Sequence, residues 1–212
     1  FPFELTVYTA KQAHVVFRSS ITGKPIERAT IAELEARLAA EYPGLKLEDA
    51  VEEIGNQIDV FQYFEALLLP LENVKQHPRY HPEGDALYHS LQVFDLACDE
   101  LPYDQEFLCA ALLHDVGKAI DLHHHVEAGL EALQGFITER TAWLIAHHMD
   151  AHRILEGTLG QRARRRLQKS ESYDELLLLG SCDRDGREAG VQATELEAAL
   201  DYLRELDQMC SG

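Results

Sequence analysis

The chain has 212 residues, 46% of them hydrophobic, which is enough for one sizeable globular core. Its formal net charge of −18 argues against broad nucleic-acid binding, which depends on basic surfaces. No apolar run approaches the length of a membrane span; the run Leu67–Leu71 is short and is broken by Pro70. We therefore expect no membrane partner.

The N-terminus and the cysteines predict a cytoplasmic location. Phe1–Phe3 has no basic region that leads into an apolar stretch, so no signal peptide is evident. The cysteines show no close pairing, and Cys98, Cys109 and Cys182 lie in apolar helical contexts. We interpret these three as reduced core residues of a cytosolic protein.

Residues 1–60 are predicted to form an N-terminal extension, and their structure is the least clear in the chain. Leu5–Thr9 and Val15–Ile21 have the composition of short strands, and Thr22–Pro25 is a turn signal. Thr30–Glu33 is a capping box, which predicts that a helix begins there.

Residues 61–212 are predicted to form one all-α domain, because apolar residues recur there at helical spacing. The first helices are expected from about Glu48 to Leu69, from Ala86 to Leu101, and from an Asp104 cap to near Asp115. Pro70 and Pro102 would end the first two.

The second half of this domain carries further helix signals. Val126–Ile137 has helical spacing, and Thr138 is placed to cap a helix that runs to His147 and His148. Two more capping boxes predict the last helices. They are Ser172–Glu175 and Thr194–Glu197.

One basic segment stands out in this acidic chain. Residues 162–169 have the sequence RARRRLQK and lie within the polar stretch 157–171, which is expected to be mobile at the surface. The favoured interpretation is a solvated helix face. The alternative is a rim that attracts phosphate.

The stretch from Ala110 to Lys118 joins an apolar helix to an adjacent histidine and aspartate, His114 and Asp115. A helix that is apolar on all sides lies inside a core. Burying two ionisable groups alone is costly, and a metal ion commonly satisfies them because imidazole and carboxylate are good ligands. Gly117 is expected to end the helix. Taken alone, the pair is equally consistent with an ordinary hydrogen bond.

Further histidines and aspartates lie on or beside apolar helices, and we expect their inward faces to converge. Adjacent helical residues diverge by about 100°, so the His-Asp pair would flank one ion, or its carboxylate would bridge two. Asp85, one turn before His89, would ligate or hold a metal-bound water. The candidate metal ligands are His89, His114, Asp115, His125, His147, His148 and Asp183.

The other histidines are assigned no metal role. A single histidine on a helix or in a loop is more often an ordinary core or surface residue than a ligand, whereas the ordered set above is hard to explain by coincidence. His123 and His124 are expected to be exposed in a loop. The same ordinary role is given to His14, His77, His81 and His152.

The residue order H…HD…H…HH…D resembles the HD-domain superfamily of metal-dependent phosphohydrolases, in the version that holds two metals. HPEGDALYHSLQVF (81–94) looks like the HD domain attached to bacterial tRNA nucleotidyltransferases, and LLHDVGK (112–118) is similar to the core motif. HVEAG (125–129), AHHM (146–149) and LLLLGSCDRDGR (176–187) resemble the later motifs. The spacing after Asp115 is shorter than usual; we choose His125 over His123 and His124 because Glu-Ala-Gly follows it.

The resemblance implies an HD-type helical bundle with two divalent ions from among Mn, Mg, Ni, Co and Fe. Asp115 would bridge the ions and orient a water, with His89, His114 and Asp183 at one ion and His125, His147 and His148 at the other. Lys118 would contact a substrate phosphate, with Arg153 and Arg187 as weaker candidates. Lys118 is also explained as a positive charge that the end of a helix favours.

The implied activity is hydrolysis of a phosphomonoester or phosphodiester, in particular of a nucleotide, by a metal-activated water. One alternative is an HD-type di-iron oxygenase, which bound-iron colour or oxygen uptake would reveal. Another is a regulatory module that binds a nucleotide without turnover. The intact His-Asp pair argues against it, since degenerate modules tend to lose that pair.

Overall fold

The computed structural model describes residues 59–76, 82 and 84–210, together with the backbone of three strands between residues 3 and 30. The chain divides into two compact units, residues 1–59 and 60–212. The division lies one residue from the boundary expected between residues 60 and 61. The assignment of an extension and an HD-type domain to these parts stays a prediction.

The first unit contains a three-stranded antiparallel sheet in the order β1–β2–β3. Its strands are β1 (Phe3–Tyr8), β2 (His14–Ser19) and β3 (Pro25–Thr30). The first two overlap the strands that the sequence predicts. The third was not expected; it begins at Pro25, a position that a strand tolerates because a first residue need not donate to the ladder. The helix predicted after Thr30 lies outside the described residues.

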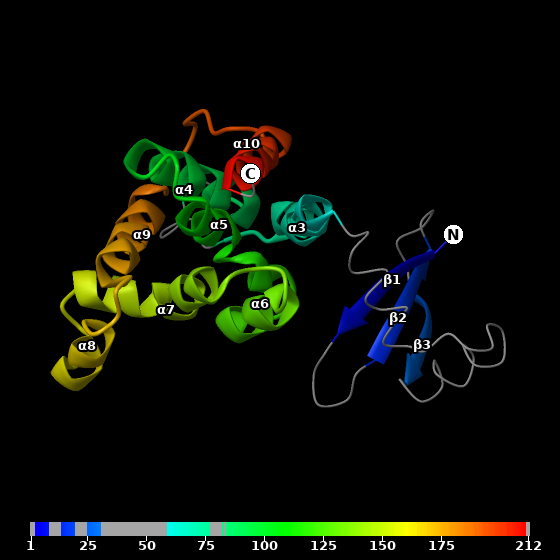
Figure 1. Cartoon of the computed structure of the whole chain (residues 1–212), viewed down its shortest axis with the longest axis horizontal. Helices are drawn as coiled ribbons and strands as arrows, with labels where there is room; N and C mark the ends of the chain where they lie inside the picture. The colour runs from blue at the N-terminus through cyan, green and yellow to red at the C-terminus, as the bar shows by residue number, and fades with distance from the viewer. Residues whose placement is uncertain are drawn as a thin grey trace. The chain divides into compact units, whose positions relative to one another are not determined.

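The described part of the second unit is helical, apart from an isolated bridge between Lys75 and Asp85 (Figure 1). The predicted all-α class is thus confirmed for this unit. Among the described residues, no helix is both long enough and apolar enough to cross a membrane. The elements are α3 (Val60–Leu68), η1 (Leu69–Asn73), α4 (Ala86–Glu100), α5 (Gln105–Leu113), η2 (Val116–Ala119), α6 (His125–Leu133), α7 (Glu139–Leu155), α8 (Gln161–Leu167), α9 (Tyr173–Asp185) and α10 (Leu196–Cys210).

Two of the predicted helix starts are confirmed by side-chain caps. The carboxylate of Asp104 accepts a hydrogen bond from the Phe107 amide at the start of α5, at 3.1 Å. The hydroxyl of Thr138 accepts one from the Thr141 amide at the start of α7, at 3.2 Å. Each cap satisfies an amide that the helix itself leaves without a partner.

The structure corrects three details of the predicted helices. Helix α7 runs on to Leu155 instead of ending at His148, because Ala151 and Ile154 continue its buried face. The stretch expected to be a mobile surface segment contains α8, which Leu167 anchors with 3% exposure. Ser172 forms no capping bond, since its backbone is not extended as a cap requires.

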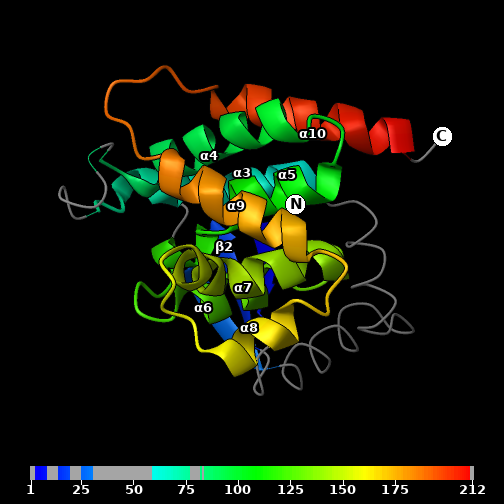
Figure 2. The ribbon, with the colours of Figure 1, turned by 90° about the vertical axis from the view of Figure 1, so that its left-hand side faces the viewer.

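Helix α5 lies at the centre of the helical unit. Every residue from Phe107 to Leu113 is buried, as expected for a helix that is apolar on all sides. It packs against α4, α7, α9 and α10, with α4 and α10 on one side and α7 on the other (Figure 2). The His-Asp pair follows its last residue, so that both side chains begin in the middle of the core.

Glycines allow the elements around this pair to approach closely. A Cβ on Gly117 would lie 1.8 Å from the carbonyl oxygen of His125, so η2 and α6 can touch only without one. A Cβ on Gly180 would lie 2.7 Å from that of Ala151, where α9 crosses α7. Gly117 does not end α5, which stops at Leu113, and its φ is not positive. Its role is close packing.

Candidate metal centre

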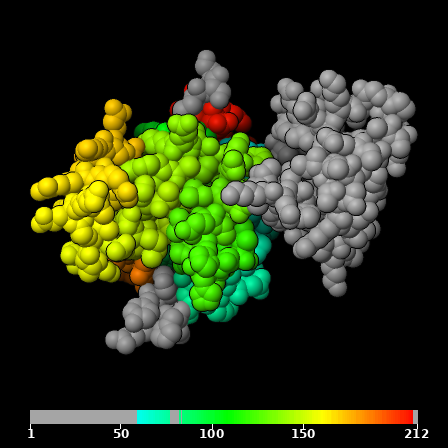
Figure 3. All heavy atoms as spheres, turned by 90° about the horizontal axis from the view of Figure 1, so that it is seen from below, coloured from blue at the N-terminus to red at the C-terminus, as the bar shows by residue number. Residues whose placement is uncertain are grey.

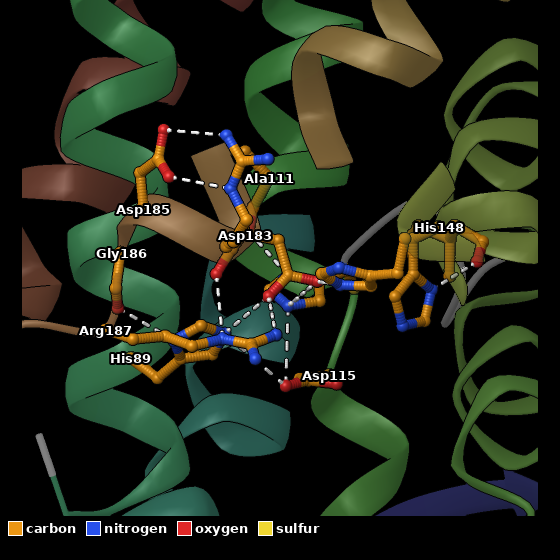
Figure 4. A network of polar contacts seen from close by, with 12 residues as sticks. His89, Ala111, Asp115, His148, Asp183, Asp185, Gly186 and Arg187 are labelled. Carbon is orange, nitrogen blue, oxygen red and sulfur yellow. Dashed lines mark hydrogen bonds and ion pairs between the residues drawn. The ribbon is translucent and has the colours of Figure 1, made fainter. Parts of the chain in front are cut away.

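Five ionisable side chains are buried where α4, α5, α7 and α9 meet. None is more than 3% exposed. Figure 4 shows His89, Asp115 and Asp183 turned toward one another, with His148 approaching from α7. The fifth is His114, the cap residue that follows Leu113 at the end of α5. Groups of this kind are buried only when hydrogen bonds or a metal ion satisfy them.

Three of the imidazoles are oriented by the backbone. His89, His114 and His148 each donate from Nδ1 to a carbonyl oxygen. In the neutral ring, the other nitrogen, Nε2, then carries no hydrogen and acts as an acceptor or a metal ligand. Such a second bond is the usual way in which proteins orient a metal-binding histidine. The acceptors are the carbonyls of Gly186, Ala111 and Ile145, at 2.9, 2.9 and 2.7 Å.

The first group of possible ligands consists of His89, His114 and Asp115, whose ligand atoms all lie within 4.8 Å of one another. Oδ2 of Asp115 lies 3.4 Å from Nε2 of His114 and 4.0 Å from Nε2 of His89. Nε2 of His114 is buried and has no hydrogen-bond partner in the described part of the chain. An orphaned lone pair that faces a carboxylate is a good match for a cation.

The second group consists of Asp115, His125 and His148, within the same 4.8 Å limit. Nε2 of His125 lies 3.7 Å from Oδ1 of Asp115 and 3.4 Å from Nε2 of His148. The two oxygens of one carboxylate thus face two different groups of imidazoles. This is the geometry that lets a carboxylate bridge two ions.

In two contacts of the site, an acceptor nitrogen of a histidine lies close to another polar atom. Nε2 of His89 lies 3.0 Å from Oδ1 of Asp183, although its Nδ1 already carries the donated hydrogen. Nε2 of His148, whose Nδ1 also carries a donated hydrogen, lies 3.4 Å from Nε2 of His125. Each contact needs a proton or a cation between the two atoms. The donor set therefore fits divalent metal ions.

The electrostatics keep these groups in the form that binds metal. Burial alone would raise the pKa of Asp115, but His114 and Lys118 outweigh it and hold that pKa well below its usual range. Burial lowers the pKa of His148 to about 4, and it also lowers the pKa of His125. Neutral imidazoles around an ionised carboxylate are ready to ligate without losing protons.

Asp183 is the second buried carboxylate of the site, and one of its partners is a residue that sequence analysis missed. Its Oδ2 accepts a hydrogen bond from Nε2 of His152, and its Oδ1 accepts one from Arg187 at 3.1 Å. Burial raises its pKa, but His152 and His89 outweigh this and hold it well below the usual range. The signal for His152 is its spacing: it lies one turn beyond His148 on the same face of α7.

Lys118 lies beside the shared carboxylate. Its Nζ is 2.5 Å from Oδ2 of Asp115 and donates to Oε1 of Gln76 at 2.7 Å. Its side chain is 14% exposed. A cation that touches both the ligand carboxylate and the edge of the site can meet an anionic group of a substrate.

Three candidate residues are not brought together with the others. His147 lies against Trp143, with the ring centres 4.8 Å apart, and its Nδ1 is 3.5 Å from Asp150. Arg153 also pairs with Asp150, at 3.3 Å, on an exposed part of α7. Asp85 caps α4 instead of joining His89: its Oδ1 accepts a hydrogen bond from the Tyr88 amide, and its Oδ2 pairs with Lys75.

The loop histidines behave as expected. His123 and His124 are exposed, and their backbone amides donate to Oδ1 of Asp121 at 2.9 and 3.2 Å. The loop thereby leads into α6, whose first residue is His125. Among the three consecutive histidines, His125 is the one that faces Asp115.

Comparison with known proteins gives a family and a set of relatives. Residues 86–187 match the family model described as the HD domain. The chain is 34% identical to a multifunctional CCA protein of Halorhodospira halophila, over 69% of this chain and 41% of that protein. It is 29% identical to the multifunctional CCA proteins of Hahella chejuensis, over 72% and 39%, and of Acinetobacter baumannii, over 66% and 38%. The chain thus spans about two fifths of the length of these relatives.

Proposed function

Because residues 86–187 belong to the HD domain family, as the motifs predicted, we propose that this chain is a metal-dependent phosphohydrolase. The substrate is a phosphomonoester or phosphodiester. The observation that carries the proposal is the shared carboxylate: Oδ1 and Oδ2 of Asp115 face two separate groups of buried imidazoles.

His89, His114, Asp115 and Asp183 would hold the first ion. Asp183 belongs with this group because its oxygens lie 3.0 Å from Nε2 of His89 and 3.9 Å from Nε2 of His114. His125 and His148 would hold a second ion together with Asp115. Imidazole nitrogens predominate among these donors, which favours Mn, Fe, Co or Ni over Mg, a metal that prefers oxygen ligands.

Divalent ions in such a site supply an activated water and neutralise the charge of the phosphate. The chain's own residues have separate tasks. Lys118 keeps Asp115 ionised and presents a positive charge to a phosphate oxygen. Arg187, with a side chain that is 27% exposed, holds Asp183 and offers its remaining donors to the substrate.

A nucleotide is the substrate class that we propose. The likeness to CCA proteins supports it, and a phosphate group on a nucleoside matches the positive charges around Asp115 and Asp183. The overall charge of −18 does not oppose this, because bound metal ions would be the largest local charges in the site.

Elemental analysis together with a turnover assay tests the proposal. The purified chain is loaded in turn with Mn, Mg, Co, Ni and Fe. Phosphate release is measured from nucleoside monophosphates, and p-nitrophenol release from bis-p-nitrophenyl phosphate. We expect two bound ions and turnover with at least one metal. One bound ion with turnover would support the hydrolase but limit the metal site to the first group of ligands. No turnover with any metal would refute the proposal.

The di-iron oxygenase is the second candidate, because imidazoles and carboxylates also suit iron. The same samples separate the two. Two bound irons with oxygen uptake and no release of phosphate or p-nitrophenol would favour the oxygenase. Nucleotide binding without turnover, in a chain that holds no metal, would favour the regulatory module.

A further inference from the structure

Basic side chains are concentrated on α8 and the turn that follows it. Arg162, Arg165, Arg166 and Lys169 recur at the spacing of one helical face, and all are exposed, as is Arg164 beside them. The turn continues the helix, because the Lys169 amide donates to the Arg166 carbonyl at 3.3 Å. Figure 3 shows side chains of this yellow segment projecting separately from the surface. We call these five residues the basic stripe.

The basic stripe has no carboxylate partner in the part of the chain that the structure describes. Among the described residues, none of its five side chains forms an ion pair or a hydrogen bond, although the chain holds 37 aspartates and glutamates. Every other described lysine or arginine forms an ion pair with a carboxylate. These paired residues are Lys75, Lys118, Arg140, Arg153, Arg184, Arg187 and Arg204.

The chemistry of the basic stripe matches phosphodiesters. Arginine predominates in it, and the planar guanidinium binds phosphate with two parallel hydrogen bonds. From Arg162 to Lys169 the helical rise covers about 10 Å. A nucleic acid strand carries a phosphate about every 3.4 Å along a duplex axis, so the stripe can meet several at once.

A lipid surface suits the basic stripe less well. A helix that lies on a membrane inserts an apolar face, but the apolar side of α8 is used within the protein. Leu167 is 3% exposed, and no residue of α8 is among the exposed large hydrophobic side chains of the described chain.

We propose that the basic stripe is a docking surface for the phosphodiester backbone of a nucleic acid strand. The stripe shares no residue with the metal ligands, so this docking does not depend on hydrolysis at the metal centre. The acidic remainder of the chain repels polyanions, and binding is therefore confined to the stripe and is sensitive to salt.

Fluorescence anisotropy of a short labelled RNA, and of DNA with the same sequence, tests the proposal. The full chain is titrated in EDTA, so that metal ions contribute nothing and a failed hydrolase assay leaves this result unaffected. Arg165→Gln/Arg166→Gln removes two stripe charges. Arg184→Gln/Arg204→Gln removes two paired charges elsewhere and is the matched control. Circular dichroism checks that both variants are folded.

We expect the stripe variant to bind at least about tenfold more weakly at low salt, while the control stays within about twofold of the parent. The slope of log Kd against log salt should fall by about 0.7 for each lost contact to a single strand. Binding of the RNA alone, or of both the RNA and the DNA, supports the proposal. Equal losses in the two variants, no binding at low salt, or binding only to polyglutamate or to anionic phosphatidylserine vesicles would overturn it.

Discussion

Nε2 of His152 hydrogen-bonds to Oδ2 of Asp183, the buried carboxylate whose other oxygen faces His89. His152 lies on α7 and Asp183 on α9, which cross closely at Gly180. Helix α7 therefore provides one candidate ligand, His148, and also anchors a second ligand that belongs to another helix. Outer partners of this kind orient the carboxylates that bind metals.

Replacing His152 should weaken metal binding without direct loss of a ligand. We expect His152→Ala to lower the affinity for metal about 10- to 100-fold, because Asp183 loses the donor that orients it. Titration against a chelator of known affinity measures this. His147→Ala is the matched control on the same helix, since His147 lies outside both ligand groups. Equal losses in the two variants would contradict the anchoring role.

Asp115 should be required by both ions. We expect Asp115→Ala to abolish metal loading and turnover while the chain stays helical, because both carboxylate oxygens face ligand groups. His125→Ala should remove only the second ion. Metal content per chain and circular dichroism check both variants; an Asp115→Ala protein that still loads metal and turns over would refute the assignment.

Lys118 should act on substrate and not on metal loading. We expect Lys118→Met, which keeps the apolar stem, to lower kcat/KM about 100-fold through loss of a charge that faces the phosphate. Metal content should stay unchanged, and Lys118→Arg should recover part of the activity. If Lys118→Met has the same kinetics as the parent, the lysine serves only as a positive charge that the dipole at the end of the helix favours.

Gly117 should tolerate no side chain. Gly117→Ala places a methyl group against the backbone of His125, so we expect a loss of about 1–3 kcal/mol in the free energy of unfolding. The displaced His125 should also weaken the second metal site. Gly160→Ala is the control, because a Cβ there meets no atom within 4 Å. Urea denaturation compares the two, and similar losses would contradict the packing role.

Asp104 should make unfolding depend on pH. Burial raises its pKa, but hydrogen bonds from Arg140 and the Phe107 amide outweigh this and lower it. A folded pKa below the unfolded one stabilises the protein above the unfolded pKa, and this contribution disappears as the pH falls through the folded value. Asp104→Asn keeps the cap and removes the charge.

The parent should therefore be more stable than Asp104→Asn by the largest amount at neutral pH. This difference should vanish in acid, below the ordinary aspartate pKa of about 3.9. Urea denaturation in EDTA across this range measures it. Asp104→Ala also loses the cap, which should cost about 1 kcal/mol more at every pH. A stability difference between the parent and Asp104→Asn that grows in acid would contradict the lowered pKa of Asp104.

Local signals predicted the helices well where a cap or an apolar face is complete in the sequence. Asp104 and Thr138 were placed correctly because each cap involves an amide only three residues away. Ser172 also precedes a helix, α9, as its pattern predicts, but it forms no capping bond because its backbone is not extended. The basic segment was interpreted as a helix face, but the anchoring of α8 was missed because Leu167 is its main buried residue.

The sequence by itself determined the helical class, the buried His-Asp pair and the order of the HD motifs, because apolar spacing and residue type are local properties. Only the tertiary structure decided that His125 and His148 join Asp115, that His147 does not, and that His152 holds Asp183. Neighbouring helical residues point about 100° apart, so the direction in which each helix turns its face decides which side chains meet. That direction follows from how α4, α5, α7 and α9 pack together.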